Sequence, residues 1–217
     1  EGKYELDKSF DNYVLMPGLV EGHSHLFEGA LWSKLYCGYF DRQKPDGTMS
    51  LGIKNVKDLI QKLKQENENL LDPNDPLAGW GLDPIYFDDK ALDRKILDMV
   101  SDQRPIGILH ASGHKLNINS VGLKLAGFLR TGINHEGLPL GDDGLPSGEI
   151  RGAETIALVT RHVGLGKDWL SGDAEGLRNF GKICARAGVT TAADLANLQT
   201  DEAIEMMLRV TSQPDFP

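Results

Sequence analysis

Apolar residues recur every three to four positions in some stretches of the chain and form short unbroken runs in others. Residues 50–71 show the first pattern, with Lys, Gln, Glu and Asn on the opposite face. This pattern is typical of an amphipathic surface helix. Its apolar stripe consists of Ile53, Val56, Leu59, Ile60 and Leu63.

The same spacing predicts further helices along the chain. Asp88 and Asp89 are candidate N-caps for the first of them, because a carboxylate can accept hydrogen bonds from the free N–H groups of a first helical turn. Gly127 and Gly188 directly follow two others and are typical C-terminal stops. The expected ranges are 90–99, 119–126, 149–163, 174–187 and 201–210.

The short apolar runs between these helices predict strands, expected at residues 19–25, 77–80, 106–110 and 189–193. Strand and helix alternate about four times, with connections long enough for parallel crossovers, so the pattern indicates an α/β fold. Periodicity does not decide between an open sheet and a closed barrel. Residues 132–148 are rich in Gly and Asp turn signals, which predicts a hairpin-like excursion.

Composition and charge exclude several classes of function. The chain has 217 residues, 40% of them hydrophobic, and 32 acidic against 23 basic residues give a net charge of -9. Such a surface is unsuited to nucleic acid. No apolar run approaches the ~20 residues of a membrane helix, and the first residues lack a signal-peptide pattern. We therefore expect a cytoplasmic protein without nucleic-acid or membrane partners. Cys37 and Cys184 form no CxxC pair, so no thiolate zinc site is indicated.

His23 and His25 are the most informative residues of the sequence. Residues two apart on an extended strand project from the same face, so the two imidazoles would lie side by side. Neutral imidazole is a common ligand of zinc and related divalent ions. The alternative is a pair of surface histidines near a turn, and spacing alone does not decide between them.

Four segments together resemble a known family. The segment 14–32 reads VLMPGLVEGHSHLFEGALW and resembles the first barrel strand of the amidohydrolase superfamily, with its Pro-Gly, apolar pair and His-x-His. Residues 92–127, LDRKILDMVSDQRPIGILHASGHKLNINSVGLKLAG, resemble amidohydrolase family 3, which includes N-substituted formamide deformylases. The segments GLPLGDDGLPSGEIRGAE and ARAGVTTAADLAN fit the same branch, so the likeness spans nearly the whole chain.

The resemblance implies a (β/α)8 TIM-type barrel beside a small β-domain, with a metal site at the carboxyl ends of the barrel strands. His23 and His25 match the first two metal ligands of the family. The implied cofactor is one or two divalent ions, zinc first among them, which polarise the scissile carbonyl and activate water.

Parts of the family pattern have no counterpart here. The general-base aspartate after the last strand is missing, and the remaining histidines do not stand in the motifs of the downstream ligands. We expect a partial barrel: residues 1–16 are the end of the small β-domain and residues 17–217 the N-terminal part of the barrel. An open half-barrel exposes a strand edge, which predicts association into homo-oligomers. By itself the chain is expected to lack turnover.

Two further residues are candidates through the resemblance. His114 follows Gly113 in a matching stretch and is expected to line the substrate pocket or to hydrogen-bond a bound carbonyl. Family members place a Glu where this chain has Gly152, and Glu154 could substitute from the next helical turn or be a surface carboxylate. Ligation by His110 is not expected, because Gly113 and the preceding apolar run indicate strand and loop rather than a helix.

The sequence hypothesis is a metal-dependent hydrolase that cleaves a non-peptide C–N bond of a small amide, formamide or cyclic amide through metal-activated water. His23 and His25 hold the metal, and His114 and Glu154 take part in catalysis. Two alternatives stay open. The first is a non-catalytic binding or assembly fragment of the same barrel, and the second is an ester or phosphoester hydrolase on the same scaffold.

Overall fold

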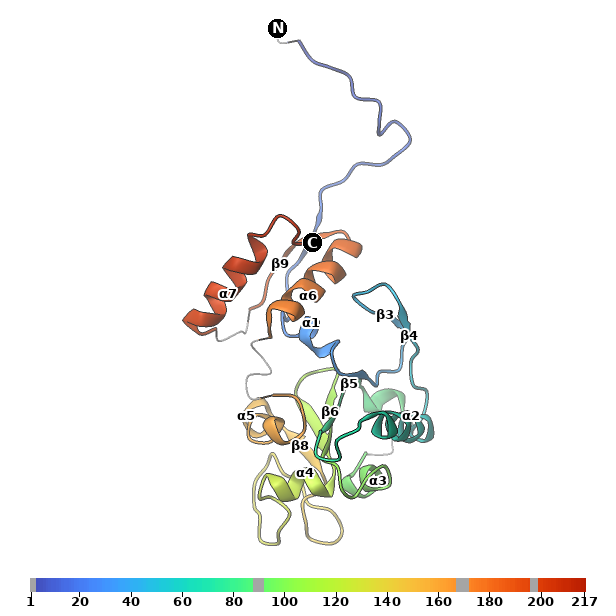
Figure 1. Cartoon of the computed structure of the whole chain (residues 1–217), viewed down its shortest axis with the longest axis vertical. Helices are drawn as coiled ribbons and strands as arrows, with labels where there is room; N and C mark the ends of the chain where they lie inside the picture. Colours follow the sequence, from blue (N-terminus) through green and yellow to red (C-terminus); the bar gives the residue numbers. More distant parts are fainter. Residues whose placement is uncertain (1–2, 88–91, 167–171, 196–198) are drawn as a thin grey trace.

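The computed structural model describes residues 3–87, 92–166, 172–195 and 199–217. Within this part, the strands form a five-stranded sheet, a separate two-stranded parallel sheet and a two-stranded hairpin (Figure 1). The strands are β1 (Leu19–Glu21), β2 (Leu35–Tyr36), β3 (Arg42–Gln43), β4 (Met49–Ser50), β5 (Leu77–Leu82), β6 (Ile106–His110), β7 (Lys115–Ile118), β8 (Glu149–Arg151) and β9 (Val189–Ala192).

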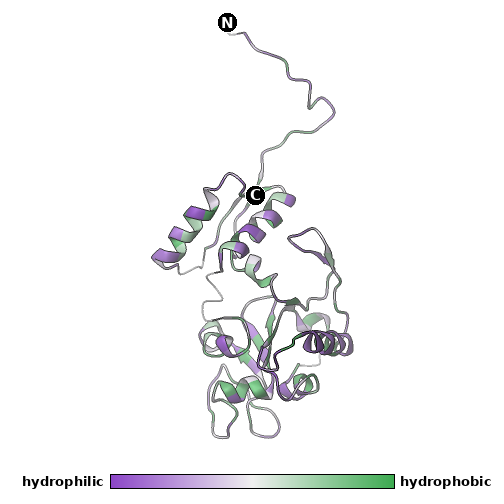
Figure 2. Ribbon diagram, viewed as in Figure 1, coloured by the Kyte–Doolittle hydropathy of each residue, from purple (hydrophilic) through white to green (hydrophobic). Residues whose placement is uncertain are grey.

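The helices surround these sheets. The α-helices are α1 (Glu28–Leu31), α2 (Val56–Asn69), α3 (Arg94–Asp98), α4 (Ser120–Leu125), α5 (Ala153–Ala157), α6 (Ala174–Arg186) and α7 (Asp201–Thr211), and the 3-10 turns are η1 (Pro84–Tyr86) and η2 (Thr160–His162). The amphipathic helices α6 and α7 carry green apolar residues beside purple polar ones (Figure 2). None of the described helices is long and apolar enough to cross a membrane.

The five-stranded sheet has the strand order β2-β5-β6-β7-β8 and is mixed. β2, β5 and β6 are parallel, as the α/β pattern predicts, whereas β7 and β8 run antiparallel to their neighbours. A (β/α)8 barrel contains only parallel strands, so this sheet is not a set of consecutive barrel units. The described chain has a mixed α/β fold without a closed barrel. The four predicted strands are present and pair in parallel, β5 with β6 and β1 with β9, but they lie in two separate sheets.

The predicted helix over residues 149–163 is wrong. Its first part is the edge strand β8, in which only Ile150 is buried, and it pairs with β7. Gly148 and Gly152 flank this strand with φ of +98° and +81°, a left-handed backbone that favours glycine and interrupts a helix. The remainder forms the short helix α5 and the turn η2.

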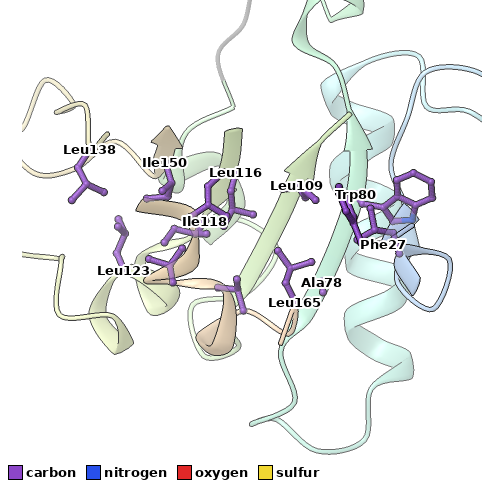
Figure 3. Close-up of a cluster of buried hydrophobic side chains, with 14 of the residues drawn as sticks. Phe27, Ala78, Trp80, Leu109, Leu116, Ile118, Leu123, Leu138, Ile150 and Leu165 are labelled. Atoms are coloured by element: carbon purple, nitrogen blue, oxygen red, sulfur yellow. The ribbon is translucent and has the colours of Figure 1, made fainter. Parts of the chain in front are cut away.

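Both faces of the five-stranded sheet are covered by apolar side chains. Every residue of β5 and β6 is buried, which explains why these strands are unbroken apolar or small-residue runs. One cluster joins Phe27, Trp80, Leu109 and Ile118 to the α4 and α5 side (Figure 3). The other cluster contains Cys37 and the buried apolar side chains of α2 and α3. The sheet therefore has a complete core of its own.

Most of the helices beside this sheet lie within the ranges predicted from the sequence. α2 lies within the predicted range 50–71 and buries Leu59 and Leu63. α4 begins after the cap Asn119 and ends before Gly127, as predicted. α3 begins at Arg94, where the Asp93 side chain accepts a hydrogen bond from the Ile96 N–H, so the helix is shorter than predicted. The proposed caps Asp88 and Asp89 lie outside the described residues.

The two-stranded sheet pairs the first and last strands of the chain. β1 and β9 are parallel, with Leu19 opposite Val189 and Glu21 opposite Ala192, and α6 precedes β9. All three residues of β1 are exposed. Residues 3–18 before it are exposed and contain no helix or strand, and they extend away from the rest of the chain (Figure 1). The assignment of residues 1–16 to a small β-domain stays a prediction.

The short helix α1 connects two parts of the chain. The five-stranded body consists of the five-stranded sheet and the helices beside it, and the two-stranded body consists of β1, β9 and α6. Gly29 of α1 lies against the Gly176 backbone of α6, where a Cβ added to Gly29 would fall 1.9 Å from the Gly176 carbonyl oxygen. On the other side, Phe27 and Leu31 are buried in the core of the five-stranded sheet. This contact fixes the carboxyl end of β1 beside the carboxyl ends of β5 and β6.

Candidate metal centre and adjoining cavity

His23 and His25 follow the carboxyl end of β1, where the strand opens into the turn before α1. Their ring centroids are 5.1 Å apart and the ring planes are nearly perpendicular. His23 is exposed, and the His25 side chain retains 34% of its exposure. His25 also stacks on the buried ring of Phe27 at 5.3 Å, which restricts its orientation. Both imidazoles therefore lie at one strand end and remain accessible.

Asp194 is a neighbour of this pair that sequence reasoning did not single out. It follows β9 at the strand end that lies next to the end of β1, and its side chain is only 6% exposed. The Ser24 N–H donates to the Ala193 carbonyl at 2.8 Å, which continues the ladder between the strands up to this point. Asp194 accepts a hydrogen bond from the Leu26 N–H at 3.0 Å and places a carboxylate oxygen 3.6 Å from His25 Nδ1.

The chemistry of these donors fits part of a metal site. Imidazole nitrogen is a favoured zinc ligand, and ligating histidines commonly present their other ring nitrogen to a carboxylate, as His25 does to Asp194. Among residues 3–87, 92–166, 172–195 and 199–217, no group of three or more His, Cys, Asp or Glu side chains is arranged to hold an ion. The described part of the chain thus offers two imidazole donors and an orienting carboxylate rather than a complete ligand set.

A cavity of about 320 Å³ opens beside His25. Its walls come from α1, from the loop after β2, and from the carboxyl ends of β5 and β6. The position agrees with a general rule, because ligands of α/β proteins bind at the carboxyl ends of parallel strands. The aromatic part of the wall consists of Phe27, Tyr36, Tyr39, Phe40, Trp80 and Tyr86, and its polar part includes His25, Glu28, Arg42, Asp83 and His110.

His110 is the buried histidine of this wall. Its Nε2 lies 2.5 Å from Asn117 Oδ1, and the amide nitrogen of Asn117 donates to the Leu92 carbonyl. Burial lowers the pKa of His110, although the hydrogen bond to Asn117 opposes the shift. The side chain is therefore neutral at pH 7. Sequence reasoning did not place His110 in a pocket, and its hydrogen-bond partner Asn117 lies on β7, a strand that the pattern did not predict.

His114 and Glu154 lie near the same strand ends of the five-stranded sheet. His114 precedes β7, Gly152 follows β8, and the Gly152 N–H donates to the His114 carbonyl at 3.0 Å. The antiparallel pairing puts both ends at the edge where β6 ends with His110. Both side chains are exposed, and neither belongs to the cavity wall, although Gly113 does. The roles expected for His114 and Glu154 stay predictions.

Gly152 stands where the resembling family has a glutamate, and the structure provides a reason for the glycine. Its φ of +81° is a left-handed conformation that ends β8 and begins α5. A glutamate there would be strained. Glu154 lies in the first turn of α5, where a carboxylate interacts favourably with the helix dipole.

Comparisons with known proteins place these features in a wider context. "Protein LONG AFTER FAR-RED 3" of Arabidopsis thaliana is 27% identical over 201 residues, which cover 89% of this chain and 31% of that protein. "Putative amidohydrolase YtcJ" of Bacillus subtilis (strain 168) is 28% identical over 130 residues, which cover 59% of this chain and 22% of that protein. The chain thus spans less than a third of the length of these relatives.

Two solved structures share the fold. Both are described as uncharacterized metal-dependent hydrolases, one from Pyrococcus horikoshii OT3 and one from Pyrococcus furiosus. The first has a TM-score of 0.53 at 15% identity and matches 93% of this chain and 35% of its own. The second has a TM-score of 0.50 at 16% identity and matches 90% of this chain and 35% of its own. The likeness extends to a part of each structure.

A family model supports the resemblance seen in the His-x-His segment and its neighbours. The model for the amidohydrolase family matches residues 11–217, which includes both imidazoles, the cavity wall and Asp194. This chain therefore belongs to the amidohydrolase family.

Proposed function

We propose that the chain provides the first two metal ligands and the substrate cavity of a metal-dependent hydrolase that cleaves a non-peptide C–N bond. The observation that carries the proposal is the position of His25, which belongs both to the imidazole pair and to the wall of the 320 Å³ cavity. Family membership supports the reaction class, and the substrate proposed is a small amide, formamide or cyclic amide.

Each residue of the strand end has a task in this proposal. His23 and His25 bind a divalent ion, zinc first among the candidates, through ring nitrogens. When bound, the ion supplies Lewis acidity toward the scissile carbonyl and makes water available as hydroxide near neutral pH. Asp194 orients His25, because a carboxylate beside Nδ1 leaves Nε2 as the nitrogen for the metal.

The cavity holds the rest of the substrate next to the metal. Phe27 stacks on His25 and is itself fixed in the sheet core, so the imidazole and the aromatic wall keep a constant spacing. The aromatic part of the wall also limits the water around the scissile bond. Positioning of this kind contributes to catalysis without any chemical step by the wall residues.

Metal binding by the 217-residue chain tests the proposal directly. We titrate the chain with zinc and monitor binding by calorimetry. Binding is expected to be lost in His23→Ala/His25→Ala and kept in the control His135→Ala/His162→Ala. Asp194→Asn should weaken binding by about 10- to 100-fold, as loss of an orienting carboxylate commonly does. Equal zinc affinity in the His23/His25 double variant and the wild type would reject the site.

Hydrolysis is a separate measurement. The chain spans about a third of the related structures, so release of amine from a small amide is measured both for this chain and for a longer chain that carries its sequence. We expect turnover only in the longer chain, and its loss in His23→Ala/His25→Ala. Turnover that survives this double substitution would contradict the assigned roles.

A non-catalytic binding module is the second candidate. It is favoured by the finding that the described residues contain no group of three metal-binding side chains. The two candidates differ in whether a longer chain hydrolyses its ligand. A longer chain that binds zinc at the His23/His25 pair but hydrolyses neither amides nor esters would support the binding module.

A further inference from the structure

The cavity beside His25 has an unusual wall, because aromatic rings from several elements meet there. Tyr36 and Trp80 form the floor and are buried, with ring centroids 5.2 Å apart. Tyr39, Phe40 and Tyr86 form the rim. The Tyr39 and Tyr86 rings are stacked at 4.8 Å, and Phe40 meets Tyr86 edge-on at 5.1 Å.

The rim rings remain accessible although they contact one another. Phe40 is 54% exposed and Tyr86 is 41% exposed. Contiguous exposed apolar surface at a concave site commonly marks a ligand site. The rim residues follow β2 and β5, so the sheet holds them at fixed positions. A planar group that enters the cavity would bury these rings further.

The size of the cavity limits the ligand. A cavity of about 150 Å³ suffices for benzene, and the volume here is about 320 Å³. One ring with a short substituent fits this space, whereas a folded peptide or an oligosaccharide does not. The ligand group is therefore a small planar one.

The charges of the wall favour a neutral ligand. Glu28 and Asp83 outnumber Arg42, so the wall has no excess of positive charge for an anion. Aromatic rims can also bind cations. Here, however, Lys54 already lies over the Tyr39 ring, with Nζ 4.3 Å from its centroid. A cationic ligand would compete with this ammonium group.

His110 adds a directional requirement. Asn117 donates through its amide nitrogen to Leu92, so the atom it presents to His110 is the carbonyl oxygen, which can only accept. His110 Nε2 therefore carries the ring proton, and Nδ1 keeps a lone pair. Among the described residues, Nδ1 has no hydrogen-bond partner. His110 thus offers an acceptor to a ligand in the cavity.

We propose that the cavity binds a neutral planar group that carries an N–H or O–H donor, and that His110 accepts this hydrogen bond through Nδ1. The proposal rests on the proposed function in one respect: the bound group is the N–H of the scissile amide together with its planar N-substituent, because His25 lies on the same wall. Aromatic secondary amides are the corresponding substrate class. His110 acts as a positioning residue.

A matched pair of ligands tests the proposal on the 217-residue chain without metal. Acetanilide is neutral and planar and has one N–H donor, whereas N-methylacetanilide lacks the donor. Calorimetry should show binding of acetanilide with an affinity about tenfold higher than that of N-methylacetanilide, as expected for one buried hydrogen bond. Phenyltrimethylammonium, a cationic probe, should bind more weakly than acetanilide.

Two sets of variants locate the binding. Tyr86→Ala and Phe40→Ala change exposed rim rings and should weaken acetanilide binding several-fold, while Phe10→Ala, a similarly exposed ring outside the cavity, should not. His110→Phe keeps a ring but removes both nitrogens, and it should abolish the preference for acetanilide over N-methylacetanilide. This double comparison isolates the hydrogen bond from general effects on folding.

Imidazole nitrogen NMR provides a readout in the wild-type chain that does not depend on any variant. We expect the Nε2–H tautomer of His110 in the free protein and a shift of the Nδ1 resonance on addition of acetanilide but not of N-methylacetanilide. An Nδ1–H tautomer, equal affinity for the two amides, or unchanged binding in Tyr86→Ala would overturn the proposal. If the wild-type chain binds acetanilide but does not bind zinc at His23 and His25, that result would instead reject the proposed function.

Discussion

The two sheets of this chain differ in how their strands are buried. Every residue of β5 and β6 in the five-stranded sheet is buried, whereas all three residues of β1 and most of β9 are exposed. The first sheet has apolar clusters on both faces. The second is held by its backbone ladder and by the contact of α1 with α6.

Because of this difference, the sheet that supplies most of the buried core is not the sheet that carries the imidazole pair. The five-stranded sheet forms the cavity wall and has a core sufficient to hold it, whereas the imidazole pair sits on a strand pair that would be marginal by itself. The packing of α1 keeps the two parts in register, because Phe27 belongs to the sheet core and Gly29 touches α6. The candidate metal site should therefore open more easily than the cavity floor.

The largest effect is expected from a comparison of the two cysteines. Cys37 follows β2 in the five-stranded body, and Cys184 lies in α6 of the two-stranded body. Cys37 is fully buried, and burial raises its pKa to about 12 from an ordinary value of 9.0, which lowers the thiolate fraction at pH 7 about a thousandfold. Cys184 in α6 is half-buried. We expect a thiol reagent to label Cys184 under native conditions and Cys37 only on unfolding.

Labelling of single-cysteine variants at increasing urea concentration measures the two openings separately. Cys184 should react already in the absence of urea, and Cys37 only at urea concentrations that unfold the five-stranded sheet. Equal protection of the two thiols would show that both bodies unfold as one unit, contrary to the comparison.

Truncation of a core side chain should have the next largest effect. Ile108 in β6 has no exposed surface, so Ile108→Ala should lower the free energy of unfolding by about 2–5 kcal/mol. Val20 in β1 is 71% exposed, and Val20→Ala should change it by less than about 0.5 kcal/mol. Urea denaturation followed by Trp fluorescence measures both. A loss at Val20 as large as that at Ile108 would mean that β1 is buried in solution.

Sequence patterns predicted the elements whose signal is local. The strand at residues 106–110 was confirmed with its bounds, and α4 and α6 begin and end at residues that cap helices. β7 and β8 were missed because polar residues alternate with apolar ones in them, over only four and three residues, so neither forms an apolar run. Ile156, Val159 and Val163 are all buried at near-helical spacing, which made the range 149–163 resemble one helix.

The site could be predicted only in part for the same physical reason. His23 and His25 are close in the sequence, so their proximity follows from the strand period. Asp194 comes next to His25 only through the parallel pairing of β1 with β9, a long-range contact that no local pattern encodes. His110 lies in the cavity wall at the end of β6, where Asn117 of β7 contacts its ring nitrogen. Sequence reasoning considered His110 only as a metal ligand and rejected that role, so it missed the pocket.

The contact between α1 and α6 gives a third test, smaller than the core truncation. Gly29→Ala would place a methyl group against the Gly176 backbone and should cost about 1–3 kcal/mol, the usual cost of overpacking. Gly22→Ala is the matched control, since a Cβ at Gly22 meets no atom within 4 Å. Urea denaturation measures the loss, and zinc titration shows whether the imidazole pair is affected as well. Equal stability of the two variants would mean that α1 does not rest on α6.

The smallest expected effect concerns acid and the five-stranded body alone. Asp143 lies in the excursion 132–148 and is attached to α3 by Arg94 and Lys95, with Lys95 Nζ at 3.2 Å. Burial raises the pKa of Asp143, but hydrogen bonds from the Leu145 N–H and these two basic side chains outweigh it and lower the pKa to about 2.

A carboxyl group whose pKa is lower in the folded than in the unfolded chain stabilises the fold above its unfolded pKa. For Asp143 this contribution is present above the ordinary value of 3.8 and is lost as the pH falls toward about 2. Asp143→Asn should therefore be less stable than the wild type at pH 7, by less than Gly29→Ala, and the two urea midpoints should converge between these pH values. The exposed neighbour Asp142→Asn serves as the control. Within the described residues, the ion pairs and hydrogen bonds of the Asp143 side chain are to Arg94, Lys95 and Leu145 of the five-stranded body. Labelling of Cys184 should therefore be the same in Asp143→Asn and the wild type throughout this range. A change there would mean that the two bodies are coupled more tightly than their burial indicates.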